Sequence, residues 1–248
     1  MGTVPVVGGD RREARRLARR AALLGAAMGI VAREGTAGLT MQAVADRVGC
    51  SVGTVYTHFS SKGVLVADLQ DVAVRRIVRS FVAVRSRSHD ELAARAATSR
   101  DVAAADLVLF GEFFVAAWDA FPEESHLLLS VLSEREAVAV PEVEQATSSA
   151  MTLLGMGHEV VAAAAAADVI TDGPVMDRVI VAASALLGVL LTDHLRHLDG
   201  DAFDHRRLTR TAWSDLVRGW GMGPADHTWA TDHVRRLAAT GPIAPDPD

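Results

Sequence analysis

The sequence predicts an all-α protein made of a small three-helix domain followed by a larger helical domain, with about nine or ten helices in all. Apolar residues recur every three to four positions over most of the 248 residues, which is the spacing of a buried helix face. No stretch alternates apolar and polar residues over the length of a strand. Residues that cap or begin helices stand at intervals suited to these segments.

The composition excludes several classes of protein. With 50% hydrophobic and 23% charged residues, the chain should bury a core, unlike a disordered or collagen-like chain. Its one cysteine, Cys50, cannot form an internal disulfide. The first residues lack the features of a secretory signal, and the apolar run at 179–191 is too short to span a bilayer core of about 30 Å. We therefore expect a cytoplasmic protein that does not enter a membrane.

The first helix should begin at Asp10, which has the spacing of a capping box to Glu13, and end at Gly35. One stripe of this helix is apolar, and arginines lie on the other side. The apolar positions are Leu17, Ala21, Leu24, Met28 and Val31, and the arginines are Arg12, Arg15, Arg16 and Arg19.

Two short helices and one long helix follow. Thr40 should cap the helix MQAVADRV, which Gly49 ends, and Ser51 should cap the helix VGTVYTHF. After Phe59, a longer helix should run from about Lys62 into the eighties.

Beyond residue 86 the chain is rich in alanine, and prolines stand where first helical turns are expected. We expect helices near 100–120, 122–138, 141–169, 174–198, 204–220 and 225–239. The chain would then consist of a domain of residues 1–65, with residues 1–10 flexible, a domain of residues 66–240, and a Pro-rich tail of residues 241–248, which we expect to be disordered.

The charge is divided unevenly along the chain. Residues 1–65 hold nine basic and four acidic side chains, a net charge of +5, whereas the remainder holds 16 basic and 27 acidic ones, a net charge of −11. A basic first domain in an acidic chain suits a polyanionic partner for that domain alone. The arginines between Arg11 and Arg20 are either an ordinary solvated helix face or a contact to the backbone or minor groove of a nucleic acid.

The two short helices have the pattern of a helix-turn-helix. This motif needs a small residue where the helices cross, a residue that tolerates positive φ in the turn, and apolar residues that face the core. Ala45, Gly49 and Val55 meet these needs, and Phe59 should belong to the same core. The remaining apolar filling is Val44, Val48 and Cys50.

The stretch LTMQAVADRVGCSVGTVYTHFSSKGVL, residues 39–65, resembles the TetR family of bacterial transcriptional regulators, and its run GTVYTHFSSK is specific. The resemblance of motifs covers about the first quarter of the chain. Downstream, the number and lengths of the helices and the ending FDHRRLTRTAWSDLVRGWG also look like the family. The resemblance implies a DNA-binding regulator whose second short helix enters the major groove.

Residue chemistry and the resemblance together give the candidate DNA contacts. The polar residues of the second short helix can hydrogen-bond base edges, and Val52 can meet a thymine methyl; alternatively, those polar residues are only solvated. In the family, the positions of Tyr56, Lys62 and Thr40 commonly reach phosphates; the alternatives are a supporting tyrosine, a solvated lysine and a threonine that only caps. The candidates are Thr40, Ser51, Val52, Gly53, Thr54, Tyr56, Thr57, His58 and Lys62.

A symmetric dimer would place two such motifs roughly 34–36 Å apart, one turn of DNA. The apolar helix 174–198 and the amphipathic helix 204–220 are expected to form a four-helix interface with their copies, as similar helices do in the family. Alternatively, both helices fill the core of one subunit. One side of the second helix carries Leu208, Ala212, Leu216 and Trp220.

The family usually keeps an effector cavity among the helices expected at 100–169. An aromatic and Met-rich stripe there suits an apolar ligand, although such a stripe is a core by default. The candidate residues are Phe110, Phe113, Phe114, Trp118, Leu128, Met151 and Met156.

We expect no enzyme activity, cofactor or metal, because no catalytic constellation survives placement on helices. Roles at helix ends and in the loop explain the one metal-like cluster. That cluster consists of Asp193, His194, His197, Asp199, Asp201, Asp204 and His205. Cys50 is expected to fill the turn beside Ser51 rather than to sense the redox state.

These features lead us to expect a TetR-like homodimeric repressor that binds a palindromic DNA operator and is released by a small apolar ligand. One alternative is an activator with the same DNA contacts. The other is an all-α small-molecule-binding protein or enzyme with a vestigial helix-turn-helix.

Overall fold

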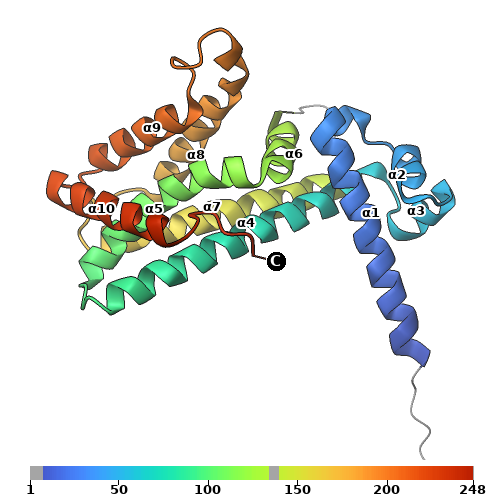
Figure 1. The fold of residues 1–248 in the computed structure, drawn as a ribbon, viewed down its shortest axis with the longest axis horizontal. Coiled ribbons are helices and arrows are strands. Elements are labelled where there is room, and N and C mark those ends of the chain that lie inside the picture. The colour runs from blue at the N-terminus through green and yellow to red at the C-terminus, as the bar shows by residue number, and fades with distance from the viewer. Residues whose placement is uncertain (1–7, 134–139, 248) are drawn as a thin grey trace, which may run out of the picture. The chain divides into compact units, whose positions relative to one another are not determined.

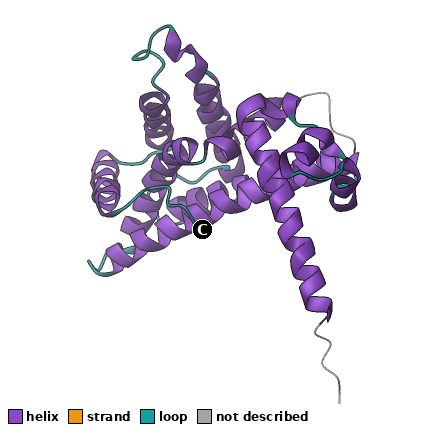
Figure 2. Cartoon of the chain, turned by 45° about the vertical axis from the view of Figure 1, so that its right-hand side comes forward, coloured by secondary structure: helices purple, strands orange, loops and turns teal. Residues whose placement is uncertain are grey.

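The structure, a computed structural model, describes residues 8–133 and 140–247. Over these residues it contains ten α-helices and one 3₁₀ helix (Figure 1), and no strand (Figure 2), which confirms the all-α prediction. The helices are α1 (Gly8–Gly38), α2 (Met41–Val48), α3 (Val52–His58), α4 (Lys62–Ala93), α5 (Ser99–Ala120), α6 (Pro122–Ser133), α7 (Val140–Ala166), α8 (Val175–Leu191), η1 (Asp193–His197), α9 (His205–Gly219) and α10 (Pro224–Thr240).

Two expectations fall partly outside the described residues. Of residues 1–10, expected to be flexible, residues 1–7 are not described, and residues 8–10 begin α1. The helix expected at 122–138 is described as far as Ser133, since residues 134–139 also lie outside.

The chain divides into two compact units. The N-terminal unit is Met1–Ala73 with Glu123–Thr147, and the C-terminal unit is Val74–Pro122 with Ser148–Asp248. This division differs from the expected boundary at residue 65, since the segment that contains most of α6 joins the first unit. Leu127 of α6 is fully buried in the core of the N-terminal unit, together with residues of α1 to α4.

Helix α1 buries only the later part of the stripe expected for it, since Met28 and Val31 are buried and Leu24 packs against the core. Leu17, expected in the core, has 53% of its surface exposed, and Ala21 is exposed as well. None of residues 11–22 is buried, so the first buried side chain of the described helix is Leu23. At its other end the helix bends at Gly35, where φ is 69°, a conformation that glycine adopts without steric cost.

The C-terminal unit is built around α5, which α9 and α10 pack against. Residues 103–109 are all buried. Gly111 lets α9 approach α5 closely, because a Cβ at this position would lie 2.1 Å from Cδ1 of Trp213. The indole Nε1–H of Trp213 donates a hydrogen bond to the carbonyl of Leu107 at 2.9 Å. Trp213 therefore fixes α9 on α5 by both packing and a polar contact.

The helix expected at 174–198 ends early, at Leu191, and a 3₁₀ helix follows. The Nδ1–H of His194 donates to the carbonyl of Leu191 at 2.8 Å, and the hydroxyl of Thr192 donates to the carbonyl of Val189 at 2.7 Å. These side chains occupy carbonyls that a further α-helical turn would use, which explains why α8 stops here.

Helix α8 is apolar on most of its surface. Among the described helices, the continuous segment Val175–His197 is long and apolar enough, by length and composition alone, to cross a membrane. Core helices of soluble proteins pass the same test. Here α8 packs against α9, while Ile180 and Val181 stay 46% and 55% exposed. The segment therefore has an apolar surface that the rest of the described chain leaves uncovered.

Residues 241–247 pack against α4, contrary to the expectation of a disordered tail. The hydroxyl of Ser80 donates to the carbonyl of Pro245 at 2.7 Å, and Arg76 pairs with Asp246 at 2.9 Å. Ala244 is buried. The Pro-rich composition disfavours a helix in this segment, but its carbonyls still accept hydrogen bonds from α4.

Candidate nucleic-acid interface

Helix α2 begins and ends with the local contacts that its sequence predicts. The hydroxyl of Thr40 accepts a hydrogen bond from the N–H of Ala43 at 3.0 Å. Gly49 ends the helix in the left-handed region, with φ 69° and ψ 45°. The N–H of Cys50 then donates to the carbonyl of Ala45 at 2.9 Å. This turn joins α2 to α3 through only three residues, Gly49, Cys50 and Ser51.

Helix α3 is capped at its start and anchored by its buried side. The hydroxyl of Ser51 accepts a hydrogen bond from the N–H of Thr54 at 3.3 Å. Val55 and Phe59 have no exposed surface, and neither does Ala45 of α2. These three side chains belong to one buried core, which holds α2 and α3 in place. Gly49, which closes α2, is exposed in the turn.

The opposite side of α3 is open to solvent. Tyr56 is 52% exposed. Ser51, Gly53 and Thr57 are exposed, and Val52, Thr54 and His58 are partly exposed. The hydroxyl of Thr57 donates to the carbonyl of Gly53 at 2.9 Å, which leaves its oxygen lone pairs available to accept from a base amino group. One short helix thus offers a phenol, hydroxyls, an imidazole and apolar methyl groups.

Lys62 lies exposed at the first residue of α4. Its Nζ donates a hydrogen bond to the carbonyl of Thr36 at 3.0 Å, near the bend of α1. An ammonium group has three N–H bonds, so two remain for another acceptor such as a phosphate. The residue therefore joins α4 to α1 and still presents a positive charge to solvent.

Arg20 supports α3 from within the N-terminal unit, a role that the sequence analysis did not identify. Its guanidinium pairs with Asp68 of α4 and lies 5.1 Å from the ring centroid of Phe59. A cation over an aromatic face stabilises the ring position that ends α3. No local pattern signals this contact, because Arg20 and Asp68 are separated by 48 positions.

The residues expected to line an effector cavity are only partly brought together. The rings of Phe110 and Phe113 lie 5.5 and 5.1 Å from that of Phe81, so these α5 residues form one aromatic cluster. Leu128 packs instead against the core of the N-terminal unit, because α6 buries its apolar side there. Met151 is 52% exposed. Phe114, Trp118 and Met156 are partly exposed.

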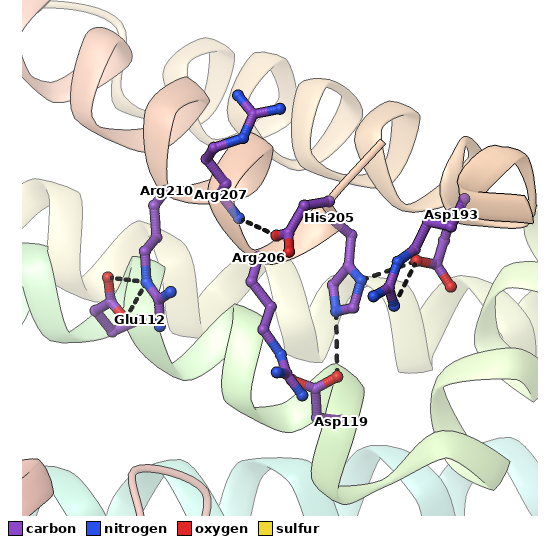
Figure 3. Close-up of polar contacts among 9 residues, drawn as sticks. Glu112, Asp119, Asp193, His205, Arg206, Arg207 and Arg210 are labelled. Carbon is purple, nitrogen blue, oxygen red and sulfur yellow. Dashed lines mark hydrogen bonds and ion pairs between the residues drawn. The ribbon is translucent and has the colours of Figure 1, made fainter. Parts of the chain in front are cut away.

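The histidine and aspartate cluster binds helices to one another (Figure 3). His205 is buried, with Nδ1 2.8 Å from an oxygen of Asp193 and Nε2 3.1 Å from an oxygen of Asp119. Arg206 donates to the other oxygen of Asp119 at 2.7 Å. Within the described ranges, no group of three or more His, Cys, Asp or Glu side chains is placed to hold a metal ion. The contacts link η1, α5 and the start of α9.

Comparison with known sequences points to one family. Residues 23–69 match the family model described as bacterial regulatory proteins, tetR family. The matched segment runs from the first buried residue of α1 through α2 and α3 into α4. A search of curated proteins found no match to this chain.

Solved structures share the fold at low sequence identity. A TetR-family transcriptional regulator from Agrobacterium tumefaciens has a TM-score of 0.60 at 14% identity, over 80% of this chain and 97% of its own. The regulator FadR from Bacillus subtilis, solved with stearoyl-CoA, has a TM-score of 0.56 at 15% identity, over 80% and 98%.

A third structure is SmeT, the repressor of the Stenotrophomonas maltophilia multidrug efflux pump SmeDEF, with a TM-score of 0.54 at 16% identity, over 81% and 89%. The structural likeness extends well beyond the segment that the family model matches. Residues 23–69 of the protein are therefore similar to the tetR family of bacterial regulatory proteins, and the chain has a TetR-like fold.

Proposed function

We propose that the protein is a cytoplasmic homodimeric repressor, which binds a palindromic DNA operator through α3 of each subunit and is released by a small apolar ligand. The observation that carries this proposal is the two-sided character of α3. Val55 and Phe59 are fully buried, whereas Tyr56 and Thr57 on the opposite side are exposed. A helix held rigidly with one polar face free suits the major groove of B-DNA.

The exposed face divides into groups for bases and groups for phosphates. Val52, Thr54, Thr57 and His58 would meet base edges, since methyl, hydroxyl and imidazole groups all find partners in the major groove. Gly53 adds no side chain and would let the backbone approach the DNA. Tyr56, Lys62, Thr40 and Ser51 would contact phosphates.

The dimer would form through α8 and α9. Ile180, Val181 and Leu191 of α8 are between 46% and 55% exposed, which is unusual for large apolar side chains on one helix. Leu208 and Leu216 of α9 are partly exposed and lie on the side expected to be apolar. Pairing with a second copy would remove both surfaces from water.

The ligand would bind in the C-terminal unit, beside the aromatic residues of α5. The FadR structure holds stearoyl-CoA, and acyl groups are apolar ligands of the kind proposed here. Phe110, Phe114, Trp118 and Met156 are partly exposed and therefore accessible to such a group. A coupling of about 1–3 kcal/mol between ligand and operator would weaken DNA binding 5- to 150-fold.

The test is selection of bound duplexes from a random DNA pool, followed by a reporter assay with the selected duplex as operator. We expect an inverted repeat with half-sites about one helical turn apart. Thr57→Ala should change base preference at the positions it contacts, and the intact protein should lower reporter expression. Recovery of no enriched sequence, or of single half-sites only, would refute the proposal as stated, and increased expression would replace repression with activation.

A further inference from the structure

The N-terminal half of α1 extends beyond the core of its unit as an uncovered helix. Residues 11–19 are all exposed, and the first buried side chain of the described helix is Leu23. Figure 1 shows this half of the blue helix running free of α2 and α3, and the turned view in Figure 2 agrees. We call residues 11–19 the arginine arm.

The arm is strongly positive and mostly unpaired. It holds five arginines, Arg11, Arg12, Arg15, Arg16 and Arg19, and one acid, Glu13. Arg16 pairs with Glu13 at 2.7 Å, and both side chains are more than half exposed. In the part of the chain that the structure describes, the other four arginines make no ion pair. Arg20, one position further on, is instead held by Asp68.

The five arginines share one side of the helix. At 100° per residue they fall within an arc of about 140°. Two side chains through which α1 packs into its unit, Leu23 and Ile30, fall within the same arc. The other buried apolar side chains of this helix, Ala27, Met28 and Val31, lie outside it. The positive surface therefore borders the packed side of α1 along one edge.

The close spacing of these arginines lowers the stability of the arm as a helix. Arg11 with Arg15, Arg12 with Arg16 and Arg15 with Arg19 are like-charge pairs at a spacing of four, each of which destabilises a helix by about 0.2–0.5 kcal/mol. An uncovered helix of this length has no tertiary packing to offset that cost. A polyanion along the arm would remove the repulsion.

We propose that the arginine arm is a second DNA-contacting surface, which binds the sugar-phosphate backbone outside the half-site read by α3. The inference rests on the proposed function. Duplex DNA carries one negative charge per about 1.7 Å of its axis, which matches a dense row of guanidinium groups. The arm and α3 belong to the same unit, and the arm holds its five arginines within nine residues, whereas the five arginines of residues 75–87 are spread over thirteen.

The test compares two triple variants on the duplex selected above. The arm variant carries Arg12→Gln, Arg15→Gln and Arg19→Gln, which remove three charges but keep good helix formers. The control variant carries Arg95→Gln, Arg218→Gln and Arg236→Gln, three exposed arginines of the C-terminal unit without ion pairs in the described structure. Both variants lose the same charge.

Two readouts are expected to separate the arm variant from the control variant, and two further measurements check that both variants are otherwise intact. The slope of log affinity against log salt should fall by about 0.9 for each lost phosphate contact, so by 2 or more in the arm variant and by much less in the control. Adding flanking base pairs of any sequence should tighten binding by the intact protein at least tenfold but not by the arm variant. Base preference within the half-site should stay unchanged, and thermal unfolding should show that both variants fold.

The inference about the arm would be overturned if the arm variant and the control variant had equal salt slopes. It would also be overturned if flanking DNA tightened binding equally in the arm variant and the intact protein. Neither result would affect the proposed function. If the intact protein selects no duplex, the proposed function is refuted, and the proposal that the arm binds DNA is refuted as well. Tight binding of the intact arm to acidic protein but not to flanking DNA would also overturn it.

Discussion

In the proposed function, a single ammonium group at residue 62 would have two tasks. It donates to the carbonyl of Thr36, and it presents positive charge where the resemblance to the TetR family implies a phosphate. The first task is structural and needs only a hydrogen-bond donor, whereas the second needs the charge. Two substitutions at the same residue can therefore separate them.

We predict that Lys62→Gln and Lys62→Ala both lower the salt slope of operator binding by about 0.9 per subunit. Only Lys62→Ala should also lower the free energy of unfolding, by about 1 kcal/mol, because glutamine still donates to the carbonyl. Salt titrations and urea unfolding measure the two effects. An unchanged slope in both variants would remove the phosphate contact from the proposed function.

Gly111 is a residue at which the absence of a side chain decides packing. A Cβ there would lie 2.1 Å from Cδ1 of Trp213, so Gly111→Ala should destabilise the protein by about 1–3 kcal/mol or more. Gly25→Ala is the matched control, because a Cβ at Gly25 meets nothing within 4 Å. That change should stabilise α1 by about 0.5–1 kcal/mol. Urea unfolding of both variants gives the comparison, and equal midpoints would contradict it.

At the scale of elements, α10 is joined to α4 by a buried polar pair. The Nε2 of His233 lies 2.8 Å from the hydroxyl of Ser88, and neither residue has exposed surface. Burial lowers the pKa of His233 below its ordinary value of 6.5; among the nearby charges, Glu91 acts in the opposite direction and Arg236 in the same one. The neutral ring is therefore the form that the fold accommodates.

The sign of the pH effect follows from proton uptake. As the pH falls through about 6.5, the unfolded chain binds a proton at His233 that the folded chain does not, so the free energy of unfolding falls. Above that range the residue contributes no pH dependence. We predict that His233→Gln loses less stability than the intact protein between pH 7.5 and 5.5. Parallel plots of the free energy of unfolding against pH for the two proteins would contradict this prediction.

The ends of the helices show which features of secondary structure can be predicted from the sequence and which cannot. The caps Thr40, Gly49 and Ser51 could be predicted because each acts within four residues of itself. The early end of α8 depends on side chains that compete for its last carbonyls, which periodicity does not report. The packed tail depends on α4 residues about 165 positions away, such as Ser80. Contacts of that range leave no local signal.

At the scale of the whole molecule, the proposed dimer depends on the uncovered side of α8. Val181 is 55% exposed in the single chain, so Val181→Glu should leave the subunit folded but place a charge in the proposed interface. We predict a monomer at micromolar concentration by sedimentation velocity, with affinity for the palindrome reduced at least tenfold. Val82→Glu, on α4 at 58% exposure, is the control and should stay dimeric. A dimeric Val181→Glu protein would exclude this interface.

The fold class and the DNA-binding segment were accessible from sequence because both rest on repeated local patterns. The residues of the candidate pocket were harder to predict from the sequence, since a stripe of large apolar residues does not reveal which unit each residue joins. Leu128 illustrates this, because α6 returns to the core of the N-terminal unit through Leu127. The same limit applies to Arg20, which lies over the ring of Phe59 at the end of α3. Its position depends on Asp68 of α4, which is distant in the sequence.

The division into two units also separates the natural chromophores of the protein. All four tryptophans, Trp118, Trp213, Trp220 and Trp229, fall in the C-terminal unit, and the one tyrosine, Tyr56, falls in the N-terminal unit on α3. Fluorescence excited at the red edge of indole absorption therefore comes from the C-terminal unit alone, so it would report the proposed ligand binding there without a contribution from α3.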